Sequence, residues 1–122
     1  MAHILLIDDD EAVREATRLV LEQSGHHVDM LADGRRAEAV AADREVDLVI
    51  TDLVMPEREG IETILALRQA DPTLPIIAVS GGGRFASGTD YLQSAGQLGA
   101  TFTLTKPIDA GRLCELVDEA LE

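Results

Sequence analysis

Acidic side chains follow two apolar runs of the sequence at the point where each run ends. Asp8, Asp9 and Asp10 come directly after the first run, and Asp52 follows a later one. Two unit charges about 4 Å apart repel by about 4 kcal/mol at an effective dielectric near 20. Clustered carboxylates therefore need either a bound proton or a divalent cation. Oxygen ligands favour Mg²⁺ or Ca²⁺ over Zn²⁺, and a site with few protein ligands and several waters suits Mg²⁺, which is the ion that we expect.

Two further reactive side chains end apolar runs. Ser80 follows one run, and Lys106, which precedes Pro107, follows another. In an open parallel sheet the carboxyl ends of the strands lie along one edge, and ligands bind there where the strand order reverses. The pattern thus predicts one shared crevice, in which Asp52 is the candidate nucleophile that attacks phosphorus to give an aspartyl phosphate. Mg²⁺, the Lys106 ammonium and the Ser80 hydroxyl would each face an oxygen of the phosphoryl group.

Each of these residues taken alone has a simpler explanation. Asp10 precedes a helical pattern and is expected to cap that helix. Ser80 alone is more often a capping hydroxyl, and Lys106 alone is more often a solvated surface lysine. The combination of all these groups at strand ends, rather than any single residue, favours a functional site.

Short strands and helices alternate along the chain and would position these residues. Apolar runs with the length of strands occur at Ile4 to Ile7, Val28 to Leu31, Leu48 to Thr51, Ile76 to Val79 and Thr101 to Leu104. Apolar residues with helical spacing lie within 13–20, 37–41, 61–68, about 88–98 and 113–121. This alternation predicts an α/β fold with a parallel sheet and helices on both faces.

Length, charge and composition restrict the class of protein. The 122 residues correspond to one ordinary domain over positions 1–122, and no apolar run approaches the roughly 20 residues that span a bilayer. The start lacks the pattern of a signal peptide, so we expect a cytoplasmic protein without membrane insertion. A net charge of −13 argues against direct binding of nucleic acid. The lone Cys114 cannot form an internal disulfide and is given no functional role.

Four ordered motifs, IDDDE, DLVITDLVMP, IIAVSG and LTKP, together resemble a bacterial response-regulator receiver domain, the family of the chemotaxis regulator. The resemblance covers nearly the whole chain. It implies a doubly wound, flavodoxin-like sheet of five parallel strands in the order 2-1-3-4-5 with five helices. It further implies phosphorelay signal transduction, in which a sensor histidine kinase or a histidine phosphotransfer protein donates a phosphoryl group to Asp52 in a Mg²⁺-dependent reaction.

The resemblance also implies roles for individual residues. Asp8, Asp9, Asp52 and the backbone carbonyl of Val54 would hold Mg²⁺. Ser80 and Lys106 would sense the phosphoryl group, and the peptide bond between Lys106 and Pro107 would be cis. Such a domain promotes its own phosphorylation and dephosphorylation without being a conventional turnover enzyme. It would act as a monomer or a phosphorylation-dependent dimer. Phosphorylation would switch the binding of a downstream protein partner at a surface formed by the fourth helix, its preceding loop, the fifth strand and the fifth helix.

The sequence departs from the family pattern at three places. Thr103 stands where a switch Tyr or Phe is usual, and Phe102 lies one place earlier, so its ring should face the other side of the strand. The stretch between Ser80 and Lys106 is a few residues longer than usual and contains GGGR, which predicts an enlarged, mobile output loop. Val54 and Gly82 occupy positions that influence the hydrolytic water, and neither side chain can orient it, so slow dephosphorylation is expected.

Other classes of protein fit the sequence less well. A pseudo-receiver that only binds partners would be expected to lack some of Asp9, Asp52 and Lys106, and all are present. A phosphatase or phosphotransferase of the haloacid dehalogenase type would carry a second Asp two positions after its nucleophile, where this chain has Val54. The GGGR run lacks the ending of a nucleotide-binding P-loop. The three histidines, His3, His26 and His27, lack metal-ligand spacing and are expected at the surface or at strand edges.

Overall fold

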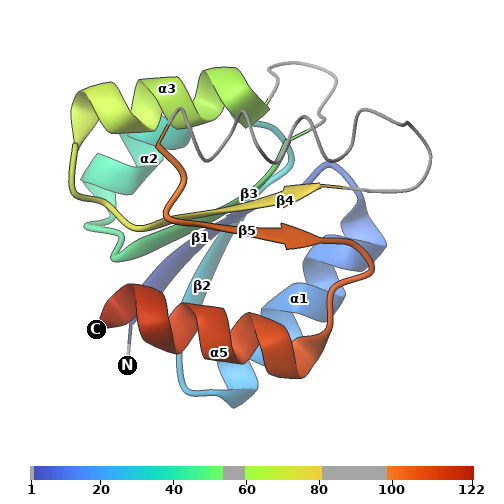
Figure 1. Ribbon diagram of the computed structural model, residues 1–122. Coiled ribbons are helices and arrows are strands. Elements are labelled where there is room, and N and C mark those ends of the chain that lie inside the picture. Colours follow the sequence, from blue (N-terminus) through green and yellow to red (C-terminus); the bar gives the residue numbers. More distant parts are fainter. Residues whose placement is uncertain (1, 54–59, 81–98) are drawn as a thin grey trace.

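The computed structural model describes residues 2–53, 60–80 and 99–122. Its core is a single sheet of five parallel strands in the order β2-β1-β3-β4-β5 (Figure 1). The strands are β1 (His3–Ile7), β2 (His27–Leu31), β3 (Leu48–Asp52), β4 (Ile76–Ser80) and β5 (Phe102–Thr105). The predicted parallel, doubly wound fold and its strand order are confirmed.

Helices cover both faces of the sheet. The described helices are α1 (Glu11–Gln23), α2 (Ala37–Asp43), α3 (Gly60–Ala70) and α5 (Ala110–Leu121). Helices α2 and α3 lie on one face, and α1 and α5 lie on the other (Figure 1). The helix predicted near 88–98 and the enlarged loop before it lie outside the described residues. No described helix has the length and apolar content that crossing a membrane requires.

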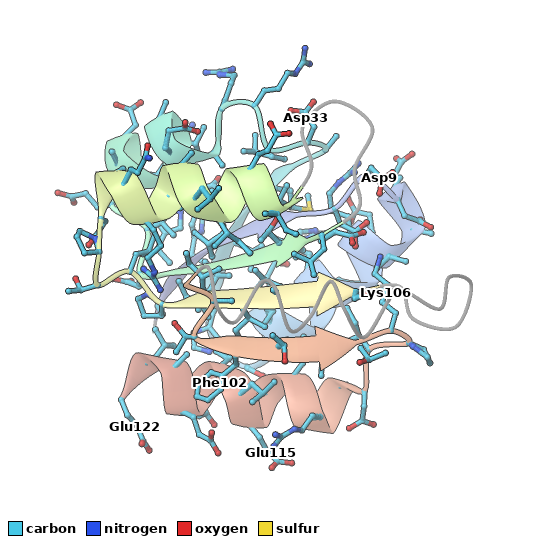
Figure 2. All side chains as sticks on the ribbon, turned by 45° about the horizontal axis from the view of Figure 1, so that its top comes forward. Asp9, Asp33, Phe102, Lys106, Glu115 and Glu122 are labelled. Atoms are coloured by element: carbon cyan, nitrogen blue, oxygen red, sulfur yellow. The ribbon has the colours of Figure 1, made fainter. Side chains whose placement is uncertain are left out.

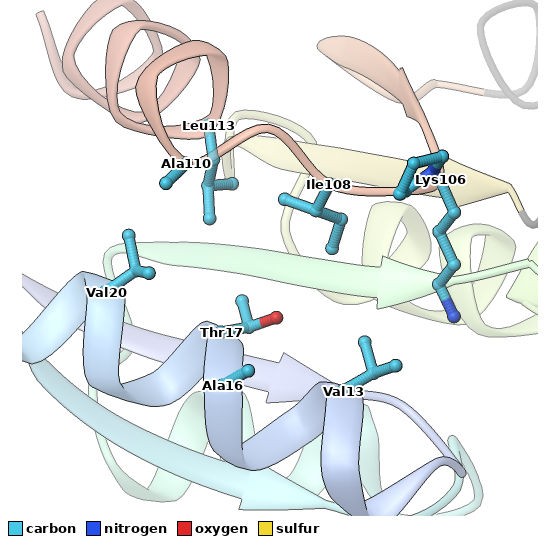
Figure 3. A pocket seen from close by; sticks show the side chains of 9 residues that line it. Val13, Ala16, Thr17, Val20, Lys106, Ile108, Ala110 and Leu113 are labelled. Atoms are coloured by element: carbon cyan, nitrogen blue, oxygen red, sulfur yellow. The ribbon is translucent and has the colours of Figure 1, made fainter.

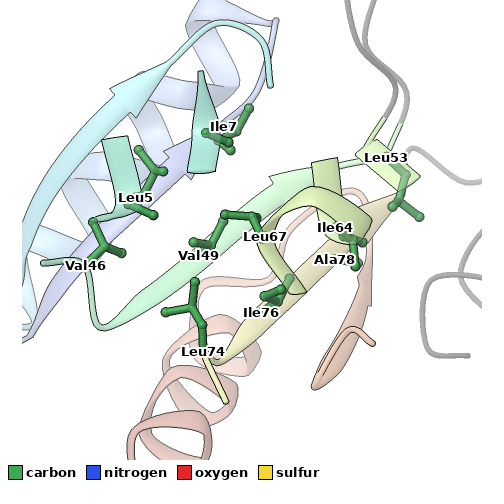
Figure 4. Packing of buried hydrophobic residues seen from close by; sticks show 12 residues of the cluster. Leu5, Ile7, Val46, Val49, Leu53, Ile64, Leu67, Leu74, Ile76 and Ala78 are labelled. Atoms are coloured by element: carbon green, nitrogen blue, oxygen red, sulfur yellow. The ribbon is translucent and has the colours of Figure 1, made fainter. Parts of the chain in front are cut away.

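The sheet separates two hydrophobic clusters. Leu5 and Ile7 of β1 point toward α2 and α3, where they join the cluster drawn in Figure 4. Ile4 and Leu6 of the same strand point to the opposite face and join the cluster under α1 and α5. Because β1 is buried on both faces, its side chains are apolar at successive positions instead of alternating with polar ones.

Aspartates begin two of the helices as N-caps. Oδ1 of Asp10 accepts hydrogen bonds from the amides of Ala12 and Val13 at 2.9 and 3.2 Å, so the predicted capping role of Asp10 is confirmed. Oδ2 of Asp109 accepts from the amide of Arg112 at 2.8 Å at the start of α5. These caps fix where α1 and α5 begin after the polar loops at the ends of β1 and β5.

Phe102 faces the α5 side of the sheet. Its half-buried ring packs against the cluster under α1 and α5, near α5 in Figure 2, whereas Thr103 is exposed on the opposite side of β5. The prediction that a one-residue shift reverses the face of the ring is therefore confirmed. Thr103 has no aromatic group that could move between two positions.

Candidate functional site

The carboxyl ends of four strands bring reactive side chains to one edge of the sheet. Asp8 directly follows β1, Asp52 and Ser80 are the last residues of β3 and β4, and Lys106 directly follows β5. Figure 2 shows Asp9 and Lys106 at this same edge. Asp8, Asp52 and Ser80 are only 4%, 5% and 2% exposed, so their polar groups are largely removed from solvent. The parallel sheet thus brings to one edge the residues that the sequence predicts to act together.

Lys106 connects two of the buried carboxylates. Its ammonium nitrogen Nζ lies 2.9 Å from Oδ2 of Asp52 and 3.0 Å from Oδ2 of Asp8. Partial burial lowers the pKa of Lys106, but the hydrogen bonds and charges of Asp52 and Asp8 outweigh it, so the pKa lies above its ordinary value of 10.5. Lys106 is therefore a permanent cation at neutral pH. It is also the only lysine in the sequence.

Backbone hydrogen bonds hold these residues in place. The amide of Lys106 donates to the carbonyl of Ser80 at 2.7 Å, which ties the end of β5 to the end of β4. The carbonyl of Asp8 accepts from Nη1 of Arg14 at 2.7 Å, and the Asp8 carboxylate accepts from the amide of Asp10 at 2.9 Å. Arg14 is a positioning residue that the sequence reasoning missed. Arg14 lies near the start of the helix that directly follows the aspartates, and this closeness in sequence could have indicated its contact with Asp8.

The acidic side chains have the donor set of a magnesium site. Asp8, Asp9 and Asp52 each offer a carboxylate oxygen, and these oxygens all lie within 4.8 Å of one another. The Lys106 ammonium offsets one unit of their charge, and a divalent cation would offset two more. Oxygen donors from few side chains, with exposed Asp9 open to solvent, fit a partly hydrated Mg²⁺. The residues present are thus suited to that ion.

Two of the residues assigned by resemblance cannot be placed. Both lie outside the described residues. Val54 carries the carbonyl that is the fourth expected ligand, and Gly82 bears on the expected lifetime of the phosphoryl group. The peptide bond between Lys106 and Pro107 is cis, as the resemblance implies.

An apolar groove adjoins the acidic residues. It has a volume of about 490 Å³ and runs between α1 and the start of α5 (Figure 3). Lys106 lines it at the end near the acidic residues. The other lining residues are Val13, Ala16, Thr17, Val20, Pro107, Ile108, Ala110 and Leu113. The groove thus runs along apolar side chains of α1 and α5 to Lys106, which contacts Asp52.

Comparisons with known proteins agree with this geometry. The family model of the response regulator receiver domain matches residues 4–118. The transcriptional regulatory protein GlrR of Escherichia coli is 33% identical over 99% of this chain, and the phosphoglycerate transport regulator PgtA of Salmonella typhimurium is 38% identical over 97%. The match spans only 26% and 28% of the lengths of these two relatives.

Solved structures show the same fold. The receiver domain of NtrX from Brucella abortus superposes with a TM-score of 0.88 at 28% identity, covering 97% of both chains. The Vibrio cholerae chemotaxis protein CheY4 superposes with a TM-score of 0.85 at 29% identity, covering 99% of both chains. The family match over nearly the whole chain, the shared fold and the acidic strand ends lead to one conclusion: this chain belongs to the response regulator receiver domain family.

Proposed function

We propose that Asp52 is the phosphoryl acceptor of this chain, and that residues 1–122 form one receiver domain with Mg²⁺ held by Asp8, Asp9, Asp52 and the carbonyl of Val54. Phosphoryl acceptance by an aspartate is the general function of the family. The observation that carries the assignment to Asp52 is its place at the end of β3, between the strands that lead to Asp8 and to Ser80, where it contacts the Lys106 ammonium at 2.9 Å. A buried carboxylate with a fixed cation next to it is positioned for charge-neutralised attack on phosphorus.

The step transfers a phosphoryl group from a phosphohistidine of a sensor histidine kinase or a histidine phosphotransfer protein. A carboxylate oxygen of Asp52 forms a bond to phosphorus, the phosphorus–nitrogen bond breaks, and the imidazole leaves with the bonding electrons. Lys106, already in contact with Asp52 and Asp8, stabilises negative charge on the phosphoryl oxygens. Asp8, Asp9 and Asp52 would hold Mg²⁺, which would supply further neutralisation of negative charge.

Ser80 is proposed to respond to phosphorylation of Asp52. Its side chain is buried at the end of β4, where its hydroxyl can donate to a phosphoryl oxygen. Its carbonyl accepts the amide hydrogen bond of Lys106 at 2.7 Å, so displacement of Ser80 pulls on the end of β5. This link supports an output surface that includes β5 and α5. The loop after β4 and the helix near 88–98 complete the proposed surface, at which a downstream protein partner binds.

The groove between α1 and α5 is proposed to receive the phosphodonor. Its walls carry apolar side chains such as Val13, Ala16 and Ile108, which suit the apolar face of a helix. Lys106 lies where the groove meets the acidic residues, so a phosphohistidine on a bound helix would approach Asp52 from this side. Direct nucleic-acid binding by this chain is not part of the proposal, because its net charge is −13.

Intact-mass measurement after exposure to a small-molecule phosphodonor tests the proposed acceptor. The wild-type chain should gain one phosphoryl group in the presence of Mg²⁺ and far less in its absence. Asp52→Asn should gain none, because an amide oxygen is a poor nucleophile and forms no stable acyl phosphate. Asp43→Asn, which changes an exposed carboxylate on α2, is the matched control and should be phosphorylated like the wild type.

The outcomes separate the possibilities clearly. An adduct of equal size in wild type and Asp52→Asn would remove Asp52 from the reaction. A wild-type adduct that forms equally with and without Mg²⁺ would contradict the assigned ion. Loss of the adduct in Asp43→Asn as well would indicate a general effect of charge rather than a specific acceptor.

A further inference from the structure

A second group of side chains of metal-binding types lies toward the opposite ends of the strands from Asp52. His3 is the first residue of β1, and His27 is the first residue of β2. Nε2 of His3 contacts Oδ2 of Asp29, and Nε2 of His27 lies 4.0 Å from the same oxygen. One ligand atom from each of the three residues lies within 4.8 Å of the others. Two imidazoles and one carboxylate thus lie close enough together to be joined by one ion.

Strand pairing creates this cluster. His3 pairs with His27 in the register of β1 and β2, which places the two rings side by side with centroids 4.6 Å apart. Asp29 lies two residues after His27 and therefore points to the same face of β2. The sequence shows no metal-ligand spacing for the three histidines and predicts surface or strand-edge positions. His3 and His27 do begin strands. Their proximity to Asp29 comes from the pairing of β1 with β2, which spacing along the sequence does not show.

The backbone around the cluster is already fixed. The amide of His3 donates to Oδ2 of Asp47 at 2.8 Å, and the carbonyl of His3 accepts from the amide of Asp47 at 2.7 Å. The amide of His27 donates to the carbonyl of Ala2 at 2.9 Å. Because these bonds hold the strand ends, binding of an ion would require side-chain rotation rather than rearrangement of the backbone.

We propose that His3, His27 and Asp29 form a binding site for a divalent transition-metal ion, with Zn²⁺ as the representative ion. Two nitrogens and one oxygen are typical zinc ligands, in contrast to the all-oxygen set around Asp52. Tetrahedral ligands at about 2.0–2.1 Å from zinc lie about 3.4 Å apart, so His27 and Asp29, now 4.0 Å apart, have to approach each other by side-chain rotation. The contact between His3 and Asp29 has to open slightly to admit the ion. Solvent reaches the site through His27, whose side chain is 59% exposed.

Arg44 has a supporting position beside the site. Its Nη1 lies 4.0 Å from Oδ1 of Asp29, on the carboxylate oxygen that does not face the imidazoles. Arg44 therefore has the place of an outer partner of a metal ligand, although its side chain is 60% exposed. An ion bound there connects the first two strands of the chain. Its effect is on the stability of β1 and β2, toward the opposite ends of the strands from the proposed phosphoryl chemistry.

Titration calorimetry with Zn²⁺ alone tests the site in the full chain. Wild type is expected to bind one equivalent through this cluster, and Zn²⁺ is expected to raise its Tm. His27→Ala and Asp29→Asn should each weaken that binding by at least about tenfold and abolish the shift in Tm. Asp29→Asn preserves the shape of the side chain, so it remains informative if His27→Ala perturbs the strand.

Two controls exclude other zinc ligands. His26→Ala removes the neighbouring histidine and should retain the binding. Asp52→Asn disrupts the acidic cluster at the other ends of the strands and should also retain it. The proposal is overturned if wild type binds no Zn²⁺, because the cluster would then be a plain His–Asp ion pair. It is also overturned if binding persists in His27→Ala and Asp29→Asn. Loss of binding in Asp52→Asn or His26→Ala would overturn it as well.

Discussion

The ammonium nitrogen of Lys106 lies 2.9 Å from Oδ2 of Asp52, although 54 positions separate the two residues in the chain. The contact exists because β3 and β5 both pair with β4 and end at the same edge of the sheet. The same nitrogen reaches Asp8, so one cation serves two buried carboxylates. Stability and the proposed phosphoryl chemistry would therefore depend on a shared set of charges.

Removal of this cation should destabilise the protein in a Mg²⁺-dependent way. Lys106→Met leaves Asp8 and Asp52 buried without their ammonium partner, so we expect a loss of about 3 kcal/mol in the free energy of unfolding without Mg²⁺. Magnesium chloride should recover part of this loss, because a divalent ion can replace the missing positive charge. Urea denaturation with and without the salt measures both effects. Lys106→Arg retains the charge and should lose less; equal losses in both variants would contradict the electrostatic explanation.

The contact between α3 and the loop that precedes α2 should not tolerate a methyl group at Gly34. A Cβ added there would lie 1.9 Å from Oγ1 of Thr63, a fully buried side chain of α3. We expect Gly34→Ala to lower the free energy of unfolding by about 1–3 kcal/mol. Combination with Thr63→Ala should cost less than the sum of the two single changes, because the clashing hydroxyl is gone.

Gly111 provides the matched comparison for that substitution. It lies in the first turn of α5, and an added Cβ would meet only Oδ2 of Asp109, at 3.4 Å. Gly111→Ala should therefore raise the free energy of unfolding, by about 0.5 kcal/mol, since alanine favours the helix more than glycine does. Thermal denaturation of the two variants side by side measures the difference. The same sign of shift for both would show that steric contact does not decide the outcome.

Arg68 should stabilise the connections around the starts of β4 and β5. Its guanidinium donates to the backbone carbonyls of Gly99, Asp71 and Leu74. Arg68→Ala leaves these carbonyls without the guanidinium, and we expect a loss of about 2 kcal/mol in the free energy of unfolding. Arg68→Lys should fall between alanine and wild type because an ammonium cannot reproduce the planar set of donors. Exposed Arg36→Ala is the control and should change stability by less than about 0.5 kcal/mol; an equal loss there would implicate net charge instead.

The carboxyl group of Asp71 should titrate below its ordinary range. The amide of Thr73 and then its hydroxyl donate to Oδ1 of Asp71, each at 3.0 Å, and these bonds together with the charge of Arg68 hold the pKa of Asp71 below 3.8. Since the pKa is lower in the folded state, the resulting stabilisation is complete above about pH 4 and disappears as the pH falls through the folded-state pKa.

Carbon NMR of the Asp71 carboxyl group measures this pKa directly. Thr73→Val retains the amide donor but removes the hydroxyl, so the pKa should rise part of the way toward its ordinary value. A pKa that stays unchanged in Thr73→Val would show that the hydroxyl contributes nothing. A wild-type pKa at or above 3.8 would contradict the stabilising role of the turn.

The fold was predictable because its main signals are local. Continuous apolar runs such as Ile4 to Ile7 mark strands buried on both faces, and the helical patterns between them require parallel crossovers. The ends of strands were less accurate. His27 extends β2 by one residue beyond the predicted start, because pairing with β1 does not require an apolar side chain. Pairing of this kind depends on the neighbouring strand and has no local signature.

The same distinction applies to the two clusters of polar side chains. Asp8, Asp52 and Lys106 were predictable as neighbours because the strand ends share an edge. The contact of Lys106 with both carboxylates was not, because it depends on the conformation of the lysine side chain. The cluster of His3 and His27 was not predictable, because it arises from a register between strands that are separated by a whole helix. Sequence spacing shows ligands on one element more readily than ligands shared by two.

The occurrence of a single lysine in the sequence makes the Asp52 environment accessible to spectroscopy. Reductive methylation with isotope-labelled formaldehyde would place labelled methyl groups on Lys106 and, besides it, only on the terminal amine. The resonance of the Lys106 methyl groups would then respond to anything that binds or modifies Asp8 or Asp52, since both carboxylates touch this nitrogen. The protein thus contains its own site for a reporter of occupancy, and no engineered label is needed.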